Sequence, residues 1–140
     1  MRIAVLTVSD TRSLNDDKSG STLSKRIESS GHQVVFRDIV KDDRQQIRSK
    51  LEDWIENDAV DVIISTGGTG LTGRDVTVEA HRDVYEKEID AFGIVFSIIS
   101  MKKIGTSAIQ CVAPLALLVE HICLRCLEVP MPVKMHGMRF

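Results

Sequence analysis

Residues 60–70 read Val-Asp-Val-Ile-Ile-Ser-Thr-Gly-Gly-Thr-Gly, a short apolar run that passes directly into a glycine-rich loop. Val60 to Ile64 is mostly β-branched, which favours a strand buried on both faces, as in a parallel sheet. Ile3 to Val8 has the same character, and Val34 to Phe36 is a shorter run of the same kind. These three runs predict the strands of one parallel sheet.

Helical patterns follow the first two of these strands. One opens at Gly20-Ser21-Thr22 and has Leu23 and Ile27 one helical turn apart. In the other, Asp42 or Asp43 can cap a helix with an apolar stripe that faces the sheet. The stripe has the spacing i, i+4, i+7 and i+8 and consists of Ile47, Leu51, Trp54 and Ile55.

A third helical pattern follows the glycine-rich loop. There Thr77 is the predicted cap of a helix that carries Ala80, Val84 and Ile89, and a further apolar segment runs from Phe92 to Ile99. Strands that alternate with helices are typical of β-α-β units with right-handed crossovers. We therefore predict an α/β fold, a three-layer sandwich with a mostly parallel sheet.

Composition narrows the class of protein. The chain has 140 residues, 43% of them hydrophobic, and a formal net charge of −2, which favours one domain with one core. A nucleic-acid binder would have a basic excess, so no nucleic-acid partner is expected. No apolar run reaches the length of about 18 residues that suggests a membrane span. The apolar N-terminal stretch is too short for a signal peptide, so a cytoplasmic protein is expected.

The cysteines do not suggest a disulfide framework, because their number is odd: Cys111, Cys123 and Cys126. Cys123 and Cys126 form a single C-x-x-C motif, for which His121 and His136 are the nearby candidates to complete a zinc site. Unpaired cysteines are the favoured interpretation, and a metal site is the alternative.

The glycine-rich loop lies where open α/β sheets bind ligands, beyond the carboxyl end of a strand. Glycines reach positive φ and have no Cβ, so successive backbone N–H groups can converge on an anion. Arg74 adds positive charge, whereas Asp75 beside a phosphate suggests an intervening Mg²⁺ ion. Hydroxyls come from Thr66, Thr69 and Thr72. The alternative is a tight strand-to-helix turn that is merely rich in glycine.

Two nucleotide-binding motifs are weak matches. Gly68, Gly70 and Gly73 fit the dinucleotide fingerprint in letters, but the loop follows the third strand and the next helix begins only near Thr77. A P-loop needs Gly-Lys followed by Ser or Thr, and that step does not occur in this loop. A nucleotide-dependent oxidoreductase is therefore a rival interpretation only.

A polar loop from Ser9 to Ser19 follows the first strand. Asp10 and Asp17 could bind a cation there or form local turns with the backbone. The N–H groups at Gly20-Ser21, where the next helix is predicted to open, offer a second anion site. A capped helix without such a site is the interpretation that the local sequence favours.

Several segments resemble the signature segments of the MoaB/MogA family of molybdenum-cofactor biosynthesis proteins. They occur in the order and with the spacing of that family over residues 1–110, and the Gly-Thr-Ser-Ala-Ile-Gln stretch makes MoaB the closer subgroup. The segments are Val8 to Arg12, Asp17 to Gly20, Thr66 to Gly70, Arg74 to Thr77, Lys87 to Ile89, Phe92-Gly93 and Ile104 to Gln110.

The resemblance implies a molybdopterin-binding fold and Mg²⁺-dependent nucleotidyl transfer. In active members, the terminal phosphate of molybdopterin attacks the α-phosphate of ATP, which gives adenylylated molybdopterin and pyrophosphate. By resemblance, Asp42 and Asp75 would be catalytic and would hold the metal. The substrate-binding residues would be Ser9, Asp10, Thr11, Asp17, Ser19, Gly20, Thr66, Gly67, Gly68, Thr69, Gly70 and Arg74. Members are trimers or hexamers, and some lack the transferase activity, so a non-catalytic molybdopterin-binding or assembly protein is the alternative.

Residues 111–140 depart from the family, which continues with a last strand, a Pro-Gly-Ser-Pro loop and a helix. Reading the third base of each codon with the first two of the next, the residues from Cys126 to Phe140 permit the string Pro-Gly-Ser-Pro-Asp-Ala-Cys-Lys-Asp-Ala-Trp-Asp-Glu-Ile. That string is the family's ending. We hypothesise a frameshift near codon 110, so that a molybdopterin-binding domain, 1–110, precedes an aberrant tail, 111–140, that disrupts the C-terminal part of the fold and could leave the chain inactive. A divergent tail is the alternative.

Overall fold

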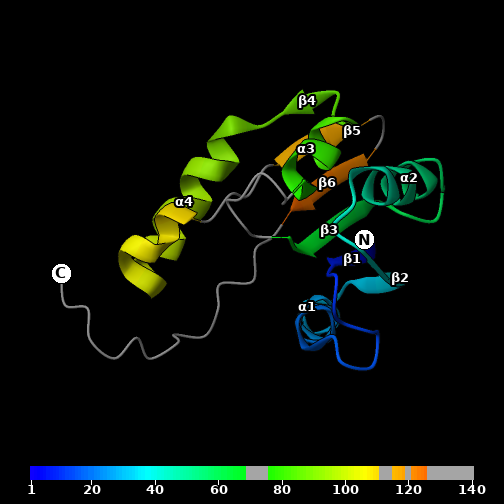
Figure 1. Ribbon diagram of the computed structural model, residues 1–140, viewed down its shortest axis with the longest axis horizontal. Helices are drawn as coiled ribbons and strands as arrows, with labels where there is room; N and C mark the ends of the chain where they lie inside the picture. Colours follow the sequence, from blue (N-terminus) through cyan, green and yellow to red (C-terminus); the bar gives the residue numbers. More distant parts are fainter. Residues whose placement is uncertain (69–75, 111–114, 119–120, 126–140) are drawn as a thin grey trace.

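A six-stranded sheet runs through the computed structural model, which describes residues 1–68, 76–110, 115–118 and 121–125. The strands lie in the order β2-β1-β3-β6-β5-β4 (Figure 1). Their bounds are β1 (Arg2–Val8), β2 (Gln33–Val40), β3 (Val62–Gly67), β4 (Lys87–Glu88), β5 (Leu115–Leu118) and β6 (His121–Arg125). Neighbours pair in parallel from β2 to β6, whereas β5 is antiparallel to both β6 and β4. The mostly parallel sheet predicted from the sequence is confirmed.

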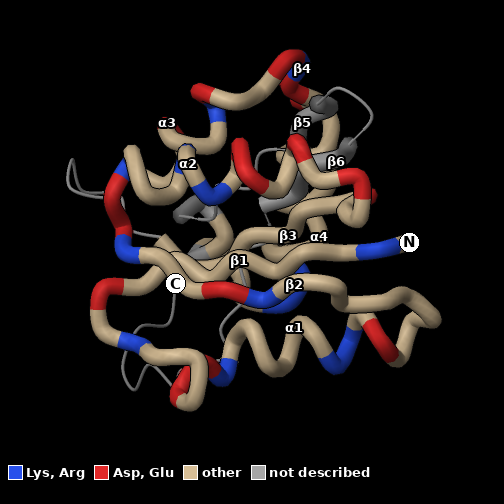
Figure 2. Tube along the Cα trace, turned by 90° about the vertical axis from the view of Figure 1, so that its right-hand side faces the viewer, with Lys and Arg blue, Asp and Glu red and all other residues tan. Residues whose placement is uncertain are grey.

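Helices cover both faces of this sheet. They are α1 (Lys18–Ser29), α2 (Arg44–Ile55), α3 (Thr77–Arg82) and α4 (Asp90–Ile104), followed by the 3₁₀ helix η1 (Gly105–Gln110). Figure 2 shows α1 on one side of the strands and α2 with α3 on the other. The predicted three-layer α/β sandwich is therefore confirmed.

Two apolar clusters form the core, one on each face of the sheet. β1 supplies both clusters, because successive side chains of a strand point to opposite faces. Leu6 faces α2 and packs with Ile47 and Leu51, and all three are fully buried. Val5 faces α1 and packs with Ile27. The predicted stripe of α2 is confirmed, with Ile47, Leu51 and Trp54 buried and Ile55 packed at its margin.

The first two helices begin where aspartates cap them. Asp43, one of the two candidates, caps α2 through its side chain, which accepts a hydrogen bond from the N–H of Gln46 at 2.9 Å. α1 begins at Lys18 rather than at Gly20, because the Asp17 side chain caps it and draws Gly20 into the first turn. The predicted start of α1 was therefore too late by half a turn.

α3 is shorter than predicted and is capped differently. Thr77 is its first helical residue rather than its cap, and the N-cap position belongs to Val76, which makes no side-chain cap. The helix ends at Arg82, so Val84 and Ile89 lie beyond it. The capping prediction for Thr77 was wrong because its hydroxyl donates to Asp42, far away in the sequence.

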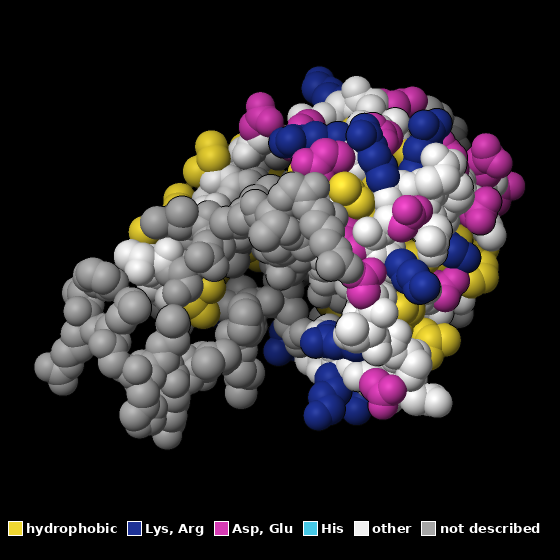
Figure 3. All heavy atoms as spheres, viewed as in Figure 1, with side chains coloured by type: hydrophobic (Ala, Val, Ile, Leu, Met, Phe, Trp, Pro, Cys, Tyr) yellow, Lys and Arg dark blue, Asp and Glu magenta, His cyan; other side chains and the backbone are white. Residues whose placement is uncertain are grey.

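The apolar segment predicted after α3 forms α4. Ile94, Val95 and Ile98 are 63%, 54% and 53% exposed on its surface. Figure 3 shows hydrophobic side chains along this part of the molecule. Among the helices of the described part, none has the length and apolar character that crossing a membrane requires.

Residues after Gln110 add two strands to the sheet. β6 lies beside β3, with Val62 paired to Ile122 and Ser65 paired to Arg125. Cys123 of the predicted C-x-x-C motif lies on β6, whereas Cys126 and Cys111 fall in the ranges 111–114, 119–120 and 126–140, which lie outside the described residues. The domain boundary near residue 110 stays a prediction, although backbone beyond it pairs within the same sheet.

Candidate functional site

Three parallel strands end at one edge of the sheet. The register pairs Val8 at the end of β1 with Val40 of β2 and with Gly67 of β3. The next N–H, that of Ser9, donates to the carbonyl of Val40 at 2.9 Å. The loops that follow β1, β2 and β3 therefore start together, at the edge where α/β sheets bind ligands.

Two glycines bring the third loop close to its neighbours. Gly67 and Gly68 have φ angles of 94° and 55°, which favour glycine. A Cβ at Gly67 would overlap the carbonyl oxygen of Val8, and a Cβ at Gly68 would overlap the hydroxyl of Thr77. These positions require glycine for both conformation and space, so the predicted close backbone approach is present at both.

Asp42 joins three segments at this edge. Its Oδ1 accepts hydrogen bonds from the Thr77 hydroxyl at 2.8 Å and from the Val76 N–H at 3.4 Å. The N–H of Asp42 donates to Oδ1 of Asp10 at 3.1 Å. The side chain is half-buried, and within the described residues its Oδ2 makes no hydrogen bond. Asp42 is thus held in place through one of its carboxylate oxygens.

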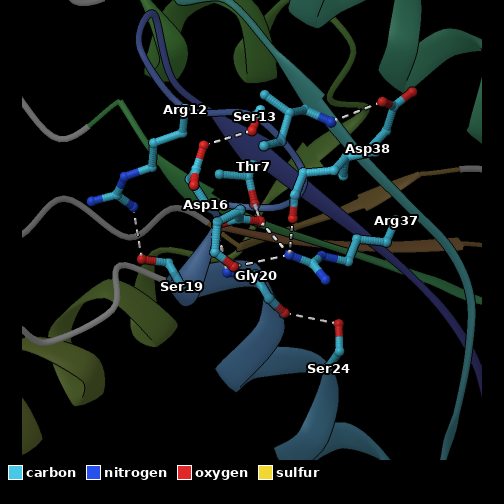
Figure 4. Close-up of polar contacts among 12 residues, drawn as sticks. Thr7, Arg12, Ser13, Asp16, Ser19, Gly20, Ser24, Arg37 and Asp38 are labelled. Carbon is cyan, nitrogen blue, oxygen red and sulfur yellow. Dashed lines mark hydrogen bonds and ion pairs between the residues drawn. The ribbon is translucent and has the colours of Figure 1, made fainter.

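The loop after β1 is folded around Ser9. The Ser9 hydroxyl oxygen accepts from the N–H groups of Arg12 at 3.2 Å and Thr11 at 3.4 Å. The exposed guanidinium of Arg12 donates to Oγ of Ser19 at 3.0 Å (Figure 4). The positive charge of the Arg12 side chain therefore lies beside Ser19, at the start of α1. Arg12 was not among the predicted site residues, although it lies within one of the segments that carry the resemblance.

Asp17, which was also predicted to bind substrate, is buried in the interior instead. Its side chain is fully buried and forms an ion pair with Arg37 at 3.0 Å. The Thr7 hydroxyl donates to it at 2.8 Å, and the Gly20 N–H at 2.9 Å. Figure 4 shows Thr7, Gly20 and Arg37 converging on this point. Burial alone would raise the pKa of Asp17, but the hydrogen bonds from Gly20, Arg37 and Thr7 outweigh burial and lower it.

The second anion site predicted at Gly20-Ser21 is contradicted. The Gly20 N–H donates to Oδ1 of Asp17, and the Ser21 N–H donates to the Asp17 carbonyl at 3.1 Å. A Cβ at Gly20 would also overlap the Asp17 carboxylate. Both N–H groups are therefore used inside the protein, and the favoured alternative of a capped helix is confirmed.

The remaining predicted residues are only partly described. Thr66 is the penultimate residue of β3 and is 3% exposed. Thr69, Gly70, Arg74 and Asp75 lie outside the described residues, so the pairing of Asp42 with Asp75 stays a prediction. Over 1–68, 76–110, 115–118 and 121–125, no three His, Cys, Asp or Glu side chains gather as a metal site.

Thr77 is the residue that sequence reasoning misassigned. It is 1% exposed and lies between Gly68 and Asp42, so it joins the glycine-rich loop to the turn after β2. A threonine before a helix has the same local pattern whether it caps that helix or bonds elsewhere. No signal near Thr77 in the sequence distinguishes the two roles.

The fold and this edge define a class of protein, an α/β ligand-binding domain whose site is built from loops after parallel strands. The chain belongs to the family described as the probable molybdopterin binding domain, which matches residues 4–127. The family expected from the sequence is confirmed, and the match extends beyond Gln110.

Individual relatives agree with this assignment. Molybdenum cofactor biosynthesis protein B of Escherichia coli (strain K12) is 45% identical over 109 residues, which are 78% of this chain and 64% of that protein. The protein of the same name from Bacillus cereus is 42% identical over 109 residues, covering 77% and 64%. The chain spans less than two thirds of the length of these relatives.

Solved structures have the same fold. A crystal structure of molybdenum cofactor biosynthesis protein B superposes with a TM-score of 0.86 at 37% identity, over 90% of this chain and 79% of the other. The tungsten cofactor synthesizing protein MoaB from Pyrococcus furiosus gives 0.79 at 28% identity, over 93% and 84%.

Proposed function

We propose that the chain binds molybdopterin at the carboxyl edge of β1, β2 and β3 and, with Mg²⁺, transfers adenylate to it from ATP. The observation that carries the proposal is the convergence of Asp42, Asp10 and the glycines 67–68 at one edge, in a member of the molybdopterin-binding family. The substrates, Mg²⁺ and a cytoplasmic location are parts of this proposal.

The groups at this edge suit phosphate chemistry. Asp42 offers a carboxylate oxygen to Mg²⁺, which prefers oxygen ligands and bridges phosphate oxygens. Arg12 offers positive charge to a phosphate beside Ser19. Thr77 fixes the rotamer of Asp42 by donating to its other oxygen. Asp75, Arg74, Thr69 and Gly70 complete the proposed set.

The proposed reaction is a displacement at phosphorus. An oxygen of the molybdopterin phosphate forms a bond to the α-phosphorus of ATP, and the bond from that phosphorus to the β-phosphate bridging oxygen breaks. Pyrophosphate leaves with the bonding electrons. Positioning and neutralisation of charge are the main requirements for such a transfer, and the groups above supply both.

An assay of pyrophosphate release tests the transfer. The chain, ATP, Mg²⁺ and molybdopterin together should release pyrophosphate, whereas omitting molybdopterin or Mg²⁺ should abolish the release. Calorimetric titration with molybdopterin alone separates binding from transfer. Binding without pyrophosphate release would favour the alternative of a non-catalytic molybdopterin-binding or assembly protein, and absence of both in this chain and in a frame-restored chain would contradict the proposal.

The tail is a second part of the proposal. If residues 111–140 come from a displaced frame, this form lacks the Pro-Gly-Ser-Pro segment of the family. It should then bind molybdopterin more weakly than a frame-restored chain, or fail to bind it. Sequencing the gene around codon 110 and titrating both forms tests this. The frameshift hypothesis would be contradicted by a gene whose reading frame is uninterrupted and whose shifted frame does not encode the family's ending. Tight binding of molybdopterin by the 140-residue form would contradict the expected loss of binding.

We also propose that the chain forms a trimer or hexamer, in which α4 would be covered. Ile94, Val95 and Ile98 are more than half exposed, and clustered exposed apolar side chains of this kind mark interaction surfaces. Light scattering during size-exclusion chromatography should give a mass of three or six chains. Ile98→Asp should lower that mass, whereas Lys25→Asp on α1 should not. A monomer at every concentration would contradict the proposal.

A further inference from the structure

A buried imidazole connects the segments on either side of the glycine-rich loop. His81 of α3 is 0% exposed. Its Nε2 lies 2.8 Å from the hydroxyl oxygen of Ser65 on β3, and its Nδ1 lies 2.7 Å from the carbonyl oxygen of Thr77. Tyr85 packs against the ring edge-on, with 6.4 Å between the ring centroids.

The partners determine the tautomer of this ring. A carbonyl oxygen can only accept, so Nδ1 carries the proton and donates to Thr77. A neutral ring then leaves Nε2 as the acceptor for the hydroxyl of Ser65. The structure therefore assigns a proton to Nδ1 of His81, and a neutral ring with Nε2 as the acceptor satisfies both contacts.

The two partners enclose the glycine-rich loop in the sequence. Ser65 lies just before Thr66 and Gly67, and Thr77 is the first residue of the helix that follows the loop. Thr77 also contacts Asp42 and Gly68. One side chain therefore ties the strand that enters the loop to the helix that leaves it, and it holds the backbone of the residue that orients Asp42.

Burial excludes a direct chemical role for Ser65 and His81. Ser65 and His81 have the separation of a nucleophile and its base, but both are 0% exposed, so no substrate reaches the hydroxyl. What the ring does must therefore act through the residues that it connects.

We propose that His81 is a positioning residue, which holds Ser65 and Thr77 at a fixed separation and so keeps Gly67, Gly68 and Asp42 arranged for a phosphate ligand and its metal. The effect on ligand binding rests on the proposed function. The bridge between β3 and α3 does not rest on it.

The first test determines the tautomer of His81. In a ¹⁵N-labelled chain at neutral pH, the His81 ring, identified by its loss in His81→Asn, should show a protonated Nδ1 and an unprotonated Nε2. Ser65→Ala should shift the Nε2 resonance, whereas His32→Asn at the surface should leave it unchanged. A ring protonated on Nε2 alone would overturn the proposal, because the bond to Thr77 would not exist.

The second test separates the bridge from simple filling of space. His81→Leu keeps much of the volume but has no hydrogen bond, His81→Asn offers a donor only near Nδ1, and His81→Gln reaches only toward Nε2. Hydrogen exchange of the segment 66–77 should become about tenfold faster or more in all three variants. Exchange in α2 should change little, and His32→Asn is the matched control. Wild-type exchange in His81→Leu would overturn the proposal.

The third test measures the consequence for the site. Mg²⁺·ATP should bind the wild type and His32→Asn equally, and each His81 variant about tenfold more weakly. Equal binding by wild type and His81→Leu would overturn the positioning role. If the wild type does not bind Mg²⁺·ATP, the proposed function fails, and the tautomer and exchange experiments still decide whether His81 forms the bridge.

Discussion

Asp17 and Asp42 follow neighbouring strands of the same sheet edge, yet the fold uses them in opposite ways. Asp17 is fully buried, and its carboxylate is surrounded by Arg37, Thr7 and the Gly20 N–H. Asp42 is half-buried, is oriented by Thr77 and has one oxygen without a hydrogen bond among the described residues. Identical chemical groups thus support the fold or serve the site according to what packs around them, and substitutions can test that contrast.

Asp17→Ala should cause the largest loss of stability. It leaves the Arg37 guanidinium without its buried partner and removes the cap of α1. We expect the free energy of unfolding to fall by about 3 kcal/mol, which is the low end for a broken buried ion pair. The low end applies because the Arg37 side chain is 27% exposed. Urea denaturation followed by Trp54 fluorescence measures this change. Loss of less than about 1 kcal/mol would show that the pair is not important.

Gly68→Ala should have the next largest effect. The new Cβ would overlap the Thr77 hydroxyl at a φ of 55°, and we expect a loss of about 2 kcal/mol together with impaired ligand binding. Gly31→Ala is the matched control, because Gly31 has a φ of 81° but nothing within 4 Å of the added Cβ. It should cost about 1 kcal/mol from conformation alone. Equal losses in the two variants would argue against close packing at Gly68.

Acid should remove the contribution of Asp17 gradually. The pKa of Asp17 is lowered in the folded state. Its stabilising effect is therefore fully present above the pKa that Asp17 has in the unfolded chain, about 3.9. That effect is lost as the pH falls through the lower folded pKa. Comparison of wild type with Asp17→Asn should show stability curves that differ at neutral pH and converge in acid. Parallel curves down to the lowest pH would contradict the assignment.

Asp42→Asn should have the smallest effect on stability and a large effect on binding. The amide oxygen can still accept from Thr77, so the free energy of unfolding should change by less than about 1 kcal/mol. Mg²⁺-dependent binding of ATP should be lost, because a neutral amide is a weaker ligand for the ion. Titration calorimetry with and without Mg²⁺ checks this. A variant that unfolds as readily as Asp17→Ala would erase the contrast between the two aspartates.

Much of the architecture could be predicted from local patterns. The stripe of α2 was visible as spacing and is present, and of the two predicted cap candidates, Asp42 and Asp43, the structure shows Asp43 as the cap. The glycines of the loop indicated a close backbone approach, which Gly67 makes to Val8 and Gly68 to Thr77. These features depend on residues near in sequence or on the absence of a Cβ, so the sequence carries them directly.

The errors have a common cause. Thr77 was predicted to cap α3, and Gly20-Ser21 was considered as an anion site although the local sequence favoured a capped helix, since each pattern is normal for those roles. In the folded chain, Asp17 takes the N–H groups and is itself neutralised by Arg37 on β2, while Thr77 turns to Asp42. Asp42, the partner of Thr77, lies on a segment that no local window contains, and so does Arg37, which pairs with Asp17 in the interior.

The sequence by itself determined the alternation of strands and helices, the family, and the edge of the sheet where a ligand would bind, because periodicity and glycine placement act through neighbouring residues. Only the tertiary structure decided which carboxylate is buried and which faces the site, and that His81 bridges Ser65 and Thr77. Those outcomes depend on strand register and helix packing, which bring together groups distant in the chain, and burial then fixes the charge and hydrogen bonding of each group.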